Sequence, residues 1–320
     1  MPGEVATRYT LVRLRHESGI VCDCQRMRAF SDTKVGPLHL AMPVIRRILH
    51  SSDFSEASLV AFAHALKAAL IGKSKLTLIH VSDDEIDGTE FPGVRETLER
   101  WKLLPPGSPQ AAVAELGLDV EKVIGLGSDP VKGVLQYLAQ NGADLIVLAA
   151  YHHHGAHWLR HSISELMARK SGEMTLFIPD GTRGFVSLAD GLVSLRKILI
   201  PLAAKPRPEP AIIGAAGLVQ QLDCNSGTFS LLHVGEEESM PIAATPAVPG
   251  WDWQTITKEG DVIEAILTSA REINADLIVM STDGRTGLLD AFRGSHTERV
   301  LRHAPCPLLA IPESPLEAVK

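Results

Sequence analysis

A cluster of glycines followed by a hydroxyl group lies near the C-terminal end of the chain. Its members are Gly284, Gly287, Gly294 and Ser295. The apolar run before it, residues 275–281, is typical of a strand buried on both faces. Ser295 and Glu298 form a capping-box pattern, which predicts a helix from Ser295 to about His303. A glycine loop that leads into a helix N-terminus offers backbone N–H groups and the positive end of the helix dipole, so this stretch favours binding of a phosphate.

The spacing of this loop resembles the C-terminal signature of the universal stress protein family. Nucleotide-binding members of that family carry a glycine, two residues, a second glycine, nine residues, a third glycine, and then serine or threonine. Gly284, Gly294 and Ser295 match the later positions in type and spacing, whereas Ser281 stands in place of the first glycine. The alternative is a strand-to-helix turn that needs its glycines for backbone geometry alone.

The resemblance implies that the chain binds an adenine nucleotide, ATP, at this stretch. The residues expected at the phosphates are Gly284, Gly294 and Ser295, with Thr297 one turn further into the site. Ser281 is expected to line the pocket. Val234, at the end of another predicted strand, is expected to approach the base through its backbone.

Alternating β and α patterns run from residue 45 onward and then repeat. In the first copy, strands are predicted at 45–51, 75–81, 120–124, 144–150 and 175–178, with helices at 55–70, 93–102, 131–140 and from residue 162. Strands at 196–201, 230–234, 275–281 and 308–311 repeat the first, second, fourth and fifth of these. The predicted fold class is therefore α/β, with two tandem open-sheet domains, each a mostly parallel five-stranded sheet with helices on both faces. The resemblance implies the Rossmann-like, adenine nucleotide alpha-hydrolase-like fold.

The predicted domain boundaries follow from this repeat. Residues 1–41 show no sustained periodicity and are interpreted as an N-terminal extension, either disordered or not translated, with Met42 as the alternative start. Domain 1 spans 42–182 and carries a degenerate phosphate loop. Domain 2 spans 193–315 and carries a nearly intact one.

The two copies differ at the predicted site. In the family an aspartate just after the first strand contacts the adenosine; Asp53 matches it in the first copy, whereas Ala203 stands there in the second. The alternative role of Asp53 is the N-cap of the next helix, with Glu56 completing a capping box. The first-copy loop has lost its glycines, and His161 precedes Ser162 where the glycine should be. The first site is therefore interpreted as vestigial, and nucleotide is expected in the second copy.

A histidine-rich segment occupies the degenerate loop of the first copy. Its members are His152, His153, His154, His157 and His161. Neutral imidazole is a ligand for zinc, nickel or copper, so His152, His154 and His157 are candidate ligands for zinc or a similar metal. The alternative is a solvated loop that accepts an anion when its histidines are protonated. His80 and His233, which end matching strands, are interpreted as structural.

Composition excludes several classes of protein. The net charge of −7 in 320 residues argues against nucleic-acid binding. The sequence shows no membrane-length apolar run and no signal peptide, and four cysteines make no disulfide framework, so a cytoplasmic location is expected.

No catalytic motif emerges, so the protein is not expected to be an enzyme, beyond the slow ATP hydrolysis that the resemblance implies for some members. The expected partners are an adenine nucleotide and a second copy of the domain. Strands 175–178 and 308–311 should lie close together, because each covers the exposed edge of the other. They would form a pseudo-dimer within the chain, and a homodimer of chains is also expected. The alternative function is a stress scaffold that binds no nucleotide and acts through its surfaces and its histidine loop.

Overall fold

The computed structural model describes residues 44–83, 90–151, 163–182, 184–283 and 296–313. These residues all belong to one compact unit, residues 39–320. The N-terminal extension 1–41 lies outside the described residues, as do the histidine-rich segment and the phosphate-loop residues Gly284, Gly294 and Ser295.

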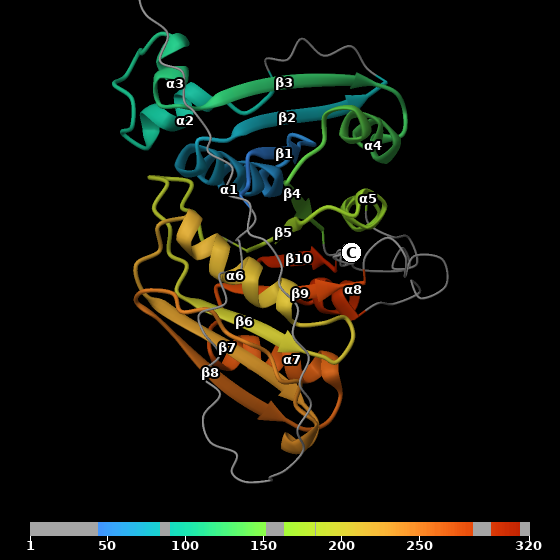
Figure 1. Ribbon diagram of the computed structural model, residues 1–320. Helices are drawn as coiled ribbons and strands as arrows, with labels where there is room; N and C mark the ends of the chain where they lie inside the picture. The colour runs from blue at the N-terminus through green and yellow to red at the C-terminus, as the bar shows by residue number, and fades with distance from the viewer. Residues whose placement is uncertain (1–43, 84–89, 152–162, 183, 284–295, 314–320) are drawn as a thin grey trace, which may run out of the picture. The chain divides into compact units, whose positions relative to one another are not determined.

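Ten strands of the described chain form one continuous sheet (Figure 1). The first copy contributes β1 (Arg47–Ser51), β2 (Lys75–Ser82), β3 (Asp119–Leu126), β4 (Leu145–Ala150) and β5 (Thr175–Pro179). The second copy contributes β6 (Lys197–Leu202), β7 (Gly227–Val234), β8 (Trp251–Lys258), β9 (Leu277–Thr282) and β10 (Leu308–Pro312). The strand order is β3-β2-β1-β4-β5-β10-β9-β6-β7-β8. Strands are parallel within each copy, so the predicted α/β fold class with five mostly parallel strands in each copy is confirmed, and the two sets of strands join into one sheet.

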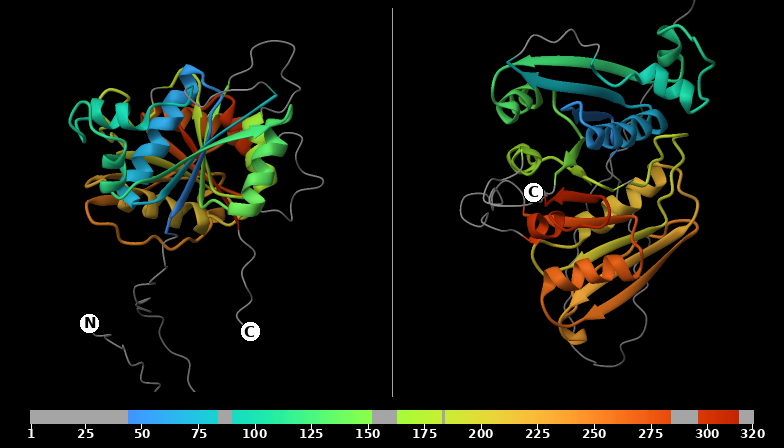
Figure 2. Two further views of the ribbon diagram at one scale, coloured as in Figure 1. Left: turned by 90° about the horizontal axis from the view of Figure 1, so that it is seen from above. Right: turned by 180° about the vertical axis from the view of Figure 1, so that it is seen from behind.

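Helices cover both faces of this sheet (Figure 2). One face packs against α1 (Glu56–Gly72), α2 (Val94–Arg100), α3 (Ala111–Glu115) and α6 (Glu209–Gln221). The other face packs against α4 (Pro130–Asn141), α5 (Ile163–Ser171), α7 (Val262–Glu272) and α8 (His296–Leu301). Between β7 and β8 the described chain forms only the 3-10 turn Glu237–Ser239, whereas the first copy has α2 and α3 between β2 and β3. No helix among the described residues is long and apolar enough to cross a membrane.

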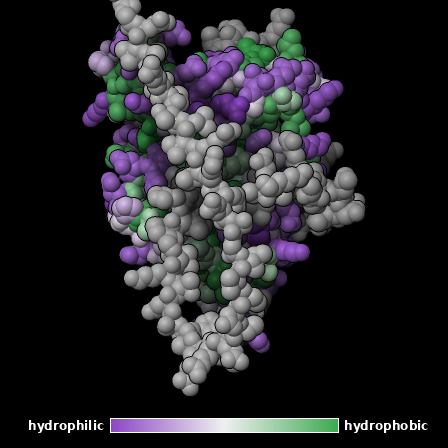
Figure 3. Space-filling view, in the orientation of Figure 1, coloured by the Kyte–Doolittle hydropathy of each residue, from purple (hydrophilic) through white to green (hydrophobic). Residues whose placement is uncertain are grey.

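The two copies meet where β5 and β10 pair. The pairing is antiparallel, with Leu308 opposite Phe177, Leu309 opposite Leu176 and Ala310 opposite Thr175. The strands predicted at 175–178 and 308–311 therefore lie side by side. Hydrophilic side chains gather near the outer edge at β3 (Figure 3), and their charges disfavour pairing of that edge with another strand, although Ile124 and Leu126 are also exposed there.

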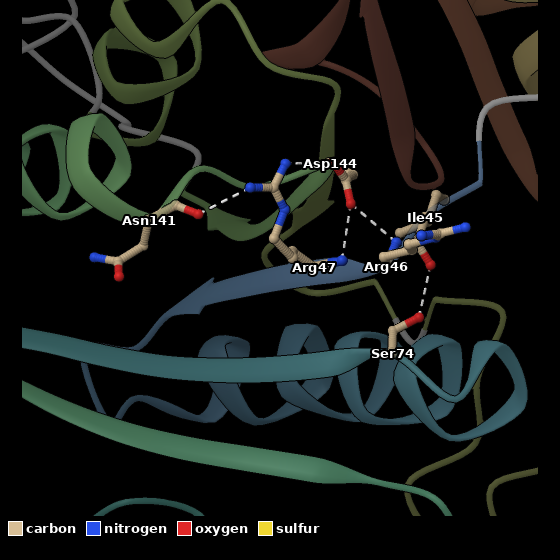
Figure 4. Close-up of polar contacts among 6 residues, drawn as sticks. All are labelled: Ile45, Arg46, Arg47, Ser74, Asn141 and Asp144. Carbon is tan, nitrogen blue, oxygen red and sulfur yellow. Dashed lines mark hydrogen bonds and ion pairs between the residues drawn. The ribbon is translucent and has the colours of Figure 1, made fainter. Parts of the chain in front are cut away.

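A partly exposed hydrogen-bond network around Asp144 fixes the amino-terminal end of the first sheet (Figure 4). The Asp144 carboxylate accepts backbone N–H bonds from Arg46 and Arg47, both at 2.9 Å, and pairs with the Arg47 guanidinium at 2.9 Å. Arg47 also donates to the backbone oxygen of Asn141 at 2.9 Å. Partial burial acts to raise the pKa of Asp144, but the hydrogen bonds from Arg47 and the two amides outweigh it and hold the pKa below its ordinary value. The start of β1 is thereby tied to the start of β4.

The second copy builds the same network. Asp276 accepts backbone N–H bonds from Arg196 and Lys197, both at 2.9 Å. Lys197 Nζ donates to the backbone oxygen of Ile273 at 3.0 Å. The repeat seen in the sequence is thus a repeat of contacts at this end of the sheet.

His64 of α1 holds the segment that leaves β5. Its Nε2 accepts backbone N–H bonds from Phe185 at 2.9 Å and Val186 at 3.1 Å, while its Nδ1 donates to the Val60 oxygen at 2.7 Å. The side chain is buried, and burial lowers the pKa of His64 to about 4. This arrangement requires the neutral imidazole, because only that form accepts at Nε2.

Candidate functional site

A cavity of about 690 Å³ lies at the carboxyl ends of the second copy's strands. Residues at the ends of β6, β7, β9 and β10 line it, together with the first turn of α8. Ligands of open α/β sheets bind at the carboxyl ends of the strands, and this volume is in the range of small-molecule sites, about 300–1,000 Å³. The cavity is therefore the candidate ligand site.

The described residues that the sequence predicts at the nucleotide come together around this cavity. Val234, Ser281 and Thr297 all line it, although they come from two different strands and a helix. Ala203, which stands where the family has aspartate, lines it as well. The remaining predicted residues, in the phosphate loop, lie outside the described residues.

Ser281 has a structural role that the sequence did not reveal. Its Oγ accepts a hydrogen bond from the backbone N–H of Ala211, at 3.1 Å, in the first turn of α6. The N-cap residue of this helix is Pro208, whose side chain makes no capping hydrogen bond. Ser281 therefore satisfies an N–H group that a helix N-terminus leaves open, and links the end of β9 to the start of α6.

His233 fixes the turn that follows Val234. Its Nε2 donates toward the Glu236 backbone oxygen and Ser239 Oγ, each at 3.0 Å, and Ser239 Oγ donates to the same Glu236 oxygen at 2.7 Å. The imidazole is buried beside the cavity. These bonds agree with the predicted structural role of this histidine.

The first copy also contributes to this cavity. Leu166, Ala168 and Arg169 of α5 line it, although they belong to the other half of the chain. The site is therefore enclosed by both copies, which the sequence did not predict.

In the first copy, the Asp53 carboxylate, which is predicted to contact adenosine, already accepts hydrogen bonds from other residues of the same copy. Tyr151 donates its hydroxyl hydrogen to Asp53 Oδ2, and Ser55 donates to Asp53 Oδ1 from its backbone N–H at 3.1 Å and from its Oγ at 2.7 Å. The alternative N-cap role of Asp53 is wrong. Ser55 caps α1, because its Oγ accepts from the backbone N–H of Ser58 at 3.1 Å, while Phe54, between the two candidates, has a left-handed φ of 64°.

The protonation states of this pair follow from their surroundings. Partial burial acts to raise the pKa of Asp53, but the hydrogen bonds from Tyr151 and Ser55 outweigh it and hold the pKa below its ordinary value. Burial, followed by the hydrogen bond to the Asp53 carboxylate, raises the pKa of Tyr151 to about 12. Near neutral pH the phenol therefore remains a donor and the carboxylate an acceptor.

The predicted metal site falls on a segment that the structure does not describe. His152, His154 and His157 lie outside the described residues. Within the part of the chain that the structure describes, no group of three or more His, Cys, Asp or Glu side chains could hold a metal ion.

Comparison with known proteins identifies the family. The model of the universal stress protein family matches residues 45–179 and 249–312, which together make up more than half of the 320 residues. The chain belongs to the universal stress protein family.

Curated relatives match shorter segments. A universal stress protein of Methanocaldococcus jannaschii is 45% identical over 53 residues, which cover 17% of this chain and 31% of that protein. A universal stress protein of Thermus aquaticus is 43% identical over 80 residues, which cover 25% of this chain and 57% of that protein. The chain thus matches less than two thirds of the length of each of these relatives.

Solved structures share the fold over most of the chain. A universal stress protein from Archaeoglobus fulgidus aligns with a TM-score of 0.56 and 19% identity, covering 83% of this chain and 98% of that one. A functionally unknown protein from Pseudomonas aeruginosa aligns with a TM-score of 0.53 and 14% identity, covering 84% of this chain and 92% of that one. At these identities the likeness concerns the fold alone.

Proposed function

We propose that this protein binds an adenine nucleotide, ATP, in the cavity of its second copy. The observation that carries the proposal is the meeting of Val234, Ser281 and Thr297 around a cavity of about 690 Å³ at the carboxyl ends of β7 and β9 and the start of α8. These three residues stand at positions where the family resemblance implies contact with the nucleotide, although at Ser281 the family has glycine. Their common location supports one ligand site.

The proposed orientation of the nucleotide follows from the elements that line the cavity. The base lies toward Val234 and Ala203, at the ends of β7 and β6, and the phosphates lie toward Thr297. Gly284, Gly294 and Ser295 of the connecting loop are proposed to complete the phosphate site. Glycine at 294 lets the backbone approach the phosphate without a Cβ between them.

The first copy is proposed to hold no nucleotide. Its Asp53 carboxylate already accepts hydrogen bonds from Tyr151 and Ser55. A ribose hydroxyl would therefore have to compete with donors that the chain itself holds next to the carboxylate. We propose a binding protein with at most slow ATP hydrolysis rather than an enzyme.

The arrangement of copies is proposed to be a pseudo-dimer within the chain. The antiparallel pairing of β5 with β10 supports it, because each strand ends its own copy and covers the edge of the other. Further pairing of two chains into a homodimer is also proposed, and light scattering of the purified protein would measure it.

Calorimetric titration with ATP tests the site. Gly294→Val should lose most of the affinity, because a Cβ there pushes the phosphate away or strains the backbone by about 1–3 kcal/mol. Asp53→Ala is the matched control in the other copy and should change affinity little. Ala203→Asp should tighten binding by up to about 1.5–3 kcal/mol, since it restores a charged hydrogen-bonding group.

Two outcomes would contradict the proposal. Loss of binding in Asp53→Ala with binding retained in Gly294→Val would move the site to the first copy. Absence of ATP binding in the unmodified protein, with no nucleotide found by mass spectrometry after purification, would leave the scaffold function in its place.

A further inference from the structure

We propose that Arg169, on α5 of the first copy, is a binding residue for the anionic part of the ligand in the second copy's cavity. The ligand would then be held by both copies at once. This inference rests on the proposed function, because it assigns a further contact to the same site.

The topology explains how a first-copy helix reaches this cavity. Because β5 runs antiparallel to β10, Thr175 near the start of β5 lies opposite Ala310 near the carboxyl end of β10. Helix α5 directly precedes β5, so its last turns arrive at the end of the sheet where β6, β7, β9 and β10 finish. Figures 1 and 2 show α5 and α8 next to each other on this face of the sheet. Residues from both helices line the cavity.

The charges around the cavity make Arg169 important. Its acidic lining residues are Glu165, Glu173, Asp283 and Glu298, of which Glu298 is paired with Arg302. Among the described lining residues the Lys and Arg side chains are Arg169, from the first copy, and Lys205, from the second. A phosphate that enters an acidic surrounding needs cationic partners, and here each copy supplies one.

Arginine suits this role better than lysine does in general. Its planar guanidinium can give two parallel N–H bonds to a phosphate, and it is the more frequent choice where phosphate is recognised in a fixed orientation. Arg169 is half-buried on the cavity side of α5, while its neighbour Lys170 is exposed and is not part of the lining.

A ligand bound in this way would tie the copies together. Between the strands themselves, the contact consists of the three residue pairs of β5 and β10. A phosphate held by Arg169 on one side and by Lys205 on the other adds a charged contact across the same junction. Binding should therefore stabilise the pairing of the copies as well as the second copy itself.

The test is a calorimetric titration of the full chain with ATP, with three variants. Arg169→Glu should weaken binding about tenfold or more, because a charge-assisted hydrogen bond to the phosphate is lost. Lys170→Glu makes the same change of charge at the next residue, and should change affinity by less than about twofold because that side chain lies off the cavity and is screened by salt. Arg169→Lys should keep more of the affinity than Arg169→Glu, since it preserves the charge.

The possible failures are distinguishable. If the unmodified protein does not bind ATP, the proposed function fails. If it binds ATP and Arg169→Glu behaves like Lys170→Glu, the nucleotide site stands and the role of Arg169 is overturned. Should Arg169→Glu unfold, Arg169→Gln provides the same comparison, and its affinity should also depend less on salt than that of the unmodified protein.

Discussion

Asp144 and Asp276 occupy the same place in the two copies and accept the same pair of backbone N–H bonds, each at 2.9 Å. At the opposite end of the sheet the copies have diverged. There Tyr151 bonds to Asp53 in the first copy, whereas the second copy has a cavity lined by Ala203 and Ser281. The amino-terminal ends carry the contacts that hold strands in register, and the carboxyl ends carry the contacts that a ligand would use. The divergence at the carboxyl ends therefore changes the contacts that a ligand could make, while the contacts at the amino-terminal ends are shared.

A further difference lies in the helix that follows the first strand of each copy: α1 of the first copy contains a buried histidine, and α6 of the second copy does not. Each helix after the first strand ends in the same way: Ser74 N–H bonds to the Ala69 oxygen at 2.9 Å in α1, and Cys224 N–H bonds to the Val219 oxygen at 2.8 Å in α6. Counting back from these ends, His64 of the first copy corresponds to Gly214 of the second. Adding a Cβ to Gly214 would bring it within 2.1 Å of Ile311 Cδ1, so any side chain there would require Ile311 to move.

The largest effect we expect is acid sensitivity of the first copy. Burial lowers the pKa of both His50 and His64 to about 4 from an ordinary value of 6.5. The unfolded chain therefore binds more protons between these values, so stability is complete above about pH 6.5 and is lost as the pH falls toward 4, on the order of 3 kcal/mol for each histidine. The counterparts Ile200 and Gly214 do not titrate.

Hydrogen exchange at pH 7 and pH 5, corrected for intrinsic rates, would measure this difference. Protection of α1 should fall more than protection of α6. The variant His50→Ile introduces the residue that the second copy has at this position, Ile200. In this variant the loss of hydrogen-exchange protection in α1 between pH 7 and pH 5 should be smaller. Equal loss of protection in both helices would show that the buried histidines do not separate the copies.

The next largest effect concerns the shared aspartates. Asp144→Ala and Asp276→Ala should each lower the free energy of unfolding by about 2 kcal/mol, because each leaves two strand N–H groups without their charged acceptor. Replacement by Asn keeps one acceptor oxygen and should cost less. Urea unfolding would measure all four variants, and a loss confined to one copy would mean that the amino-terminal ends are not equivalent.

The smallest effect is expected at Tyr151. Tyr151→Phe should lower stability by about 1 kcal/mol and raise the pKa of Asp53 toward its ordinary value, since the phenol no longer stabilises the carboxylate. Carboxyl titration by NMR would follow Asp53. Tyr137→Phe is the matched control, because Tyr137 donates to Glu121 at 2.9 Å and should leave Asp53 unchanged. An unshifted Asp53 in both variants would contradict the role of Tyr151.

Much of the fold could be predicted because it depends on local patterns. The strand β4 is buried at every position, and its unbroken apolar sequence signals this directly. The pairing of β5 with β10 was also predictable, because two apolar edges in one chain are best covered by each other. Helix ends were less certain. Asp53 and Ser55 are both good N-cap residues in sequence, and the left-handed backbone at Phe54 determines that Ser55 is the cap.

The contacts that distinguish the two sites could not be predicted, because they join residues far apart in the chain. Ser281 bonds to Ala211 across 70 residues, and Tyr151 bonds to Asp53 across 98. The hydrophobic periodicity of a segment does not predict such long-range hydrogen bonds, because they depend on the direction of side chains at the ends of strands. Comparing the repeats position by position would have directed attention to Tyr151, because it takes the place of Asp283 in the second copy.

The junction of β5 and β10 joins two copies of one chain, and this allows the sequence of each copy to change independently of the other. In a dimer of separate chains the two partners are identical, so a change in one is a change in both, and dilution separates them. Here residues 180–196 join β5 to β6, and a short covalent link of this kind keeps the partner at an effective concentration on the order of millimolar. The pairing no longer depends on the amount of protein, and each half can change alone. One copy can then lose its own ligand contacts while its residues still line the cavity of the other copy.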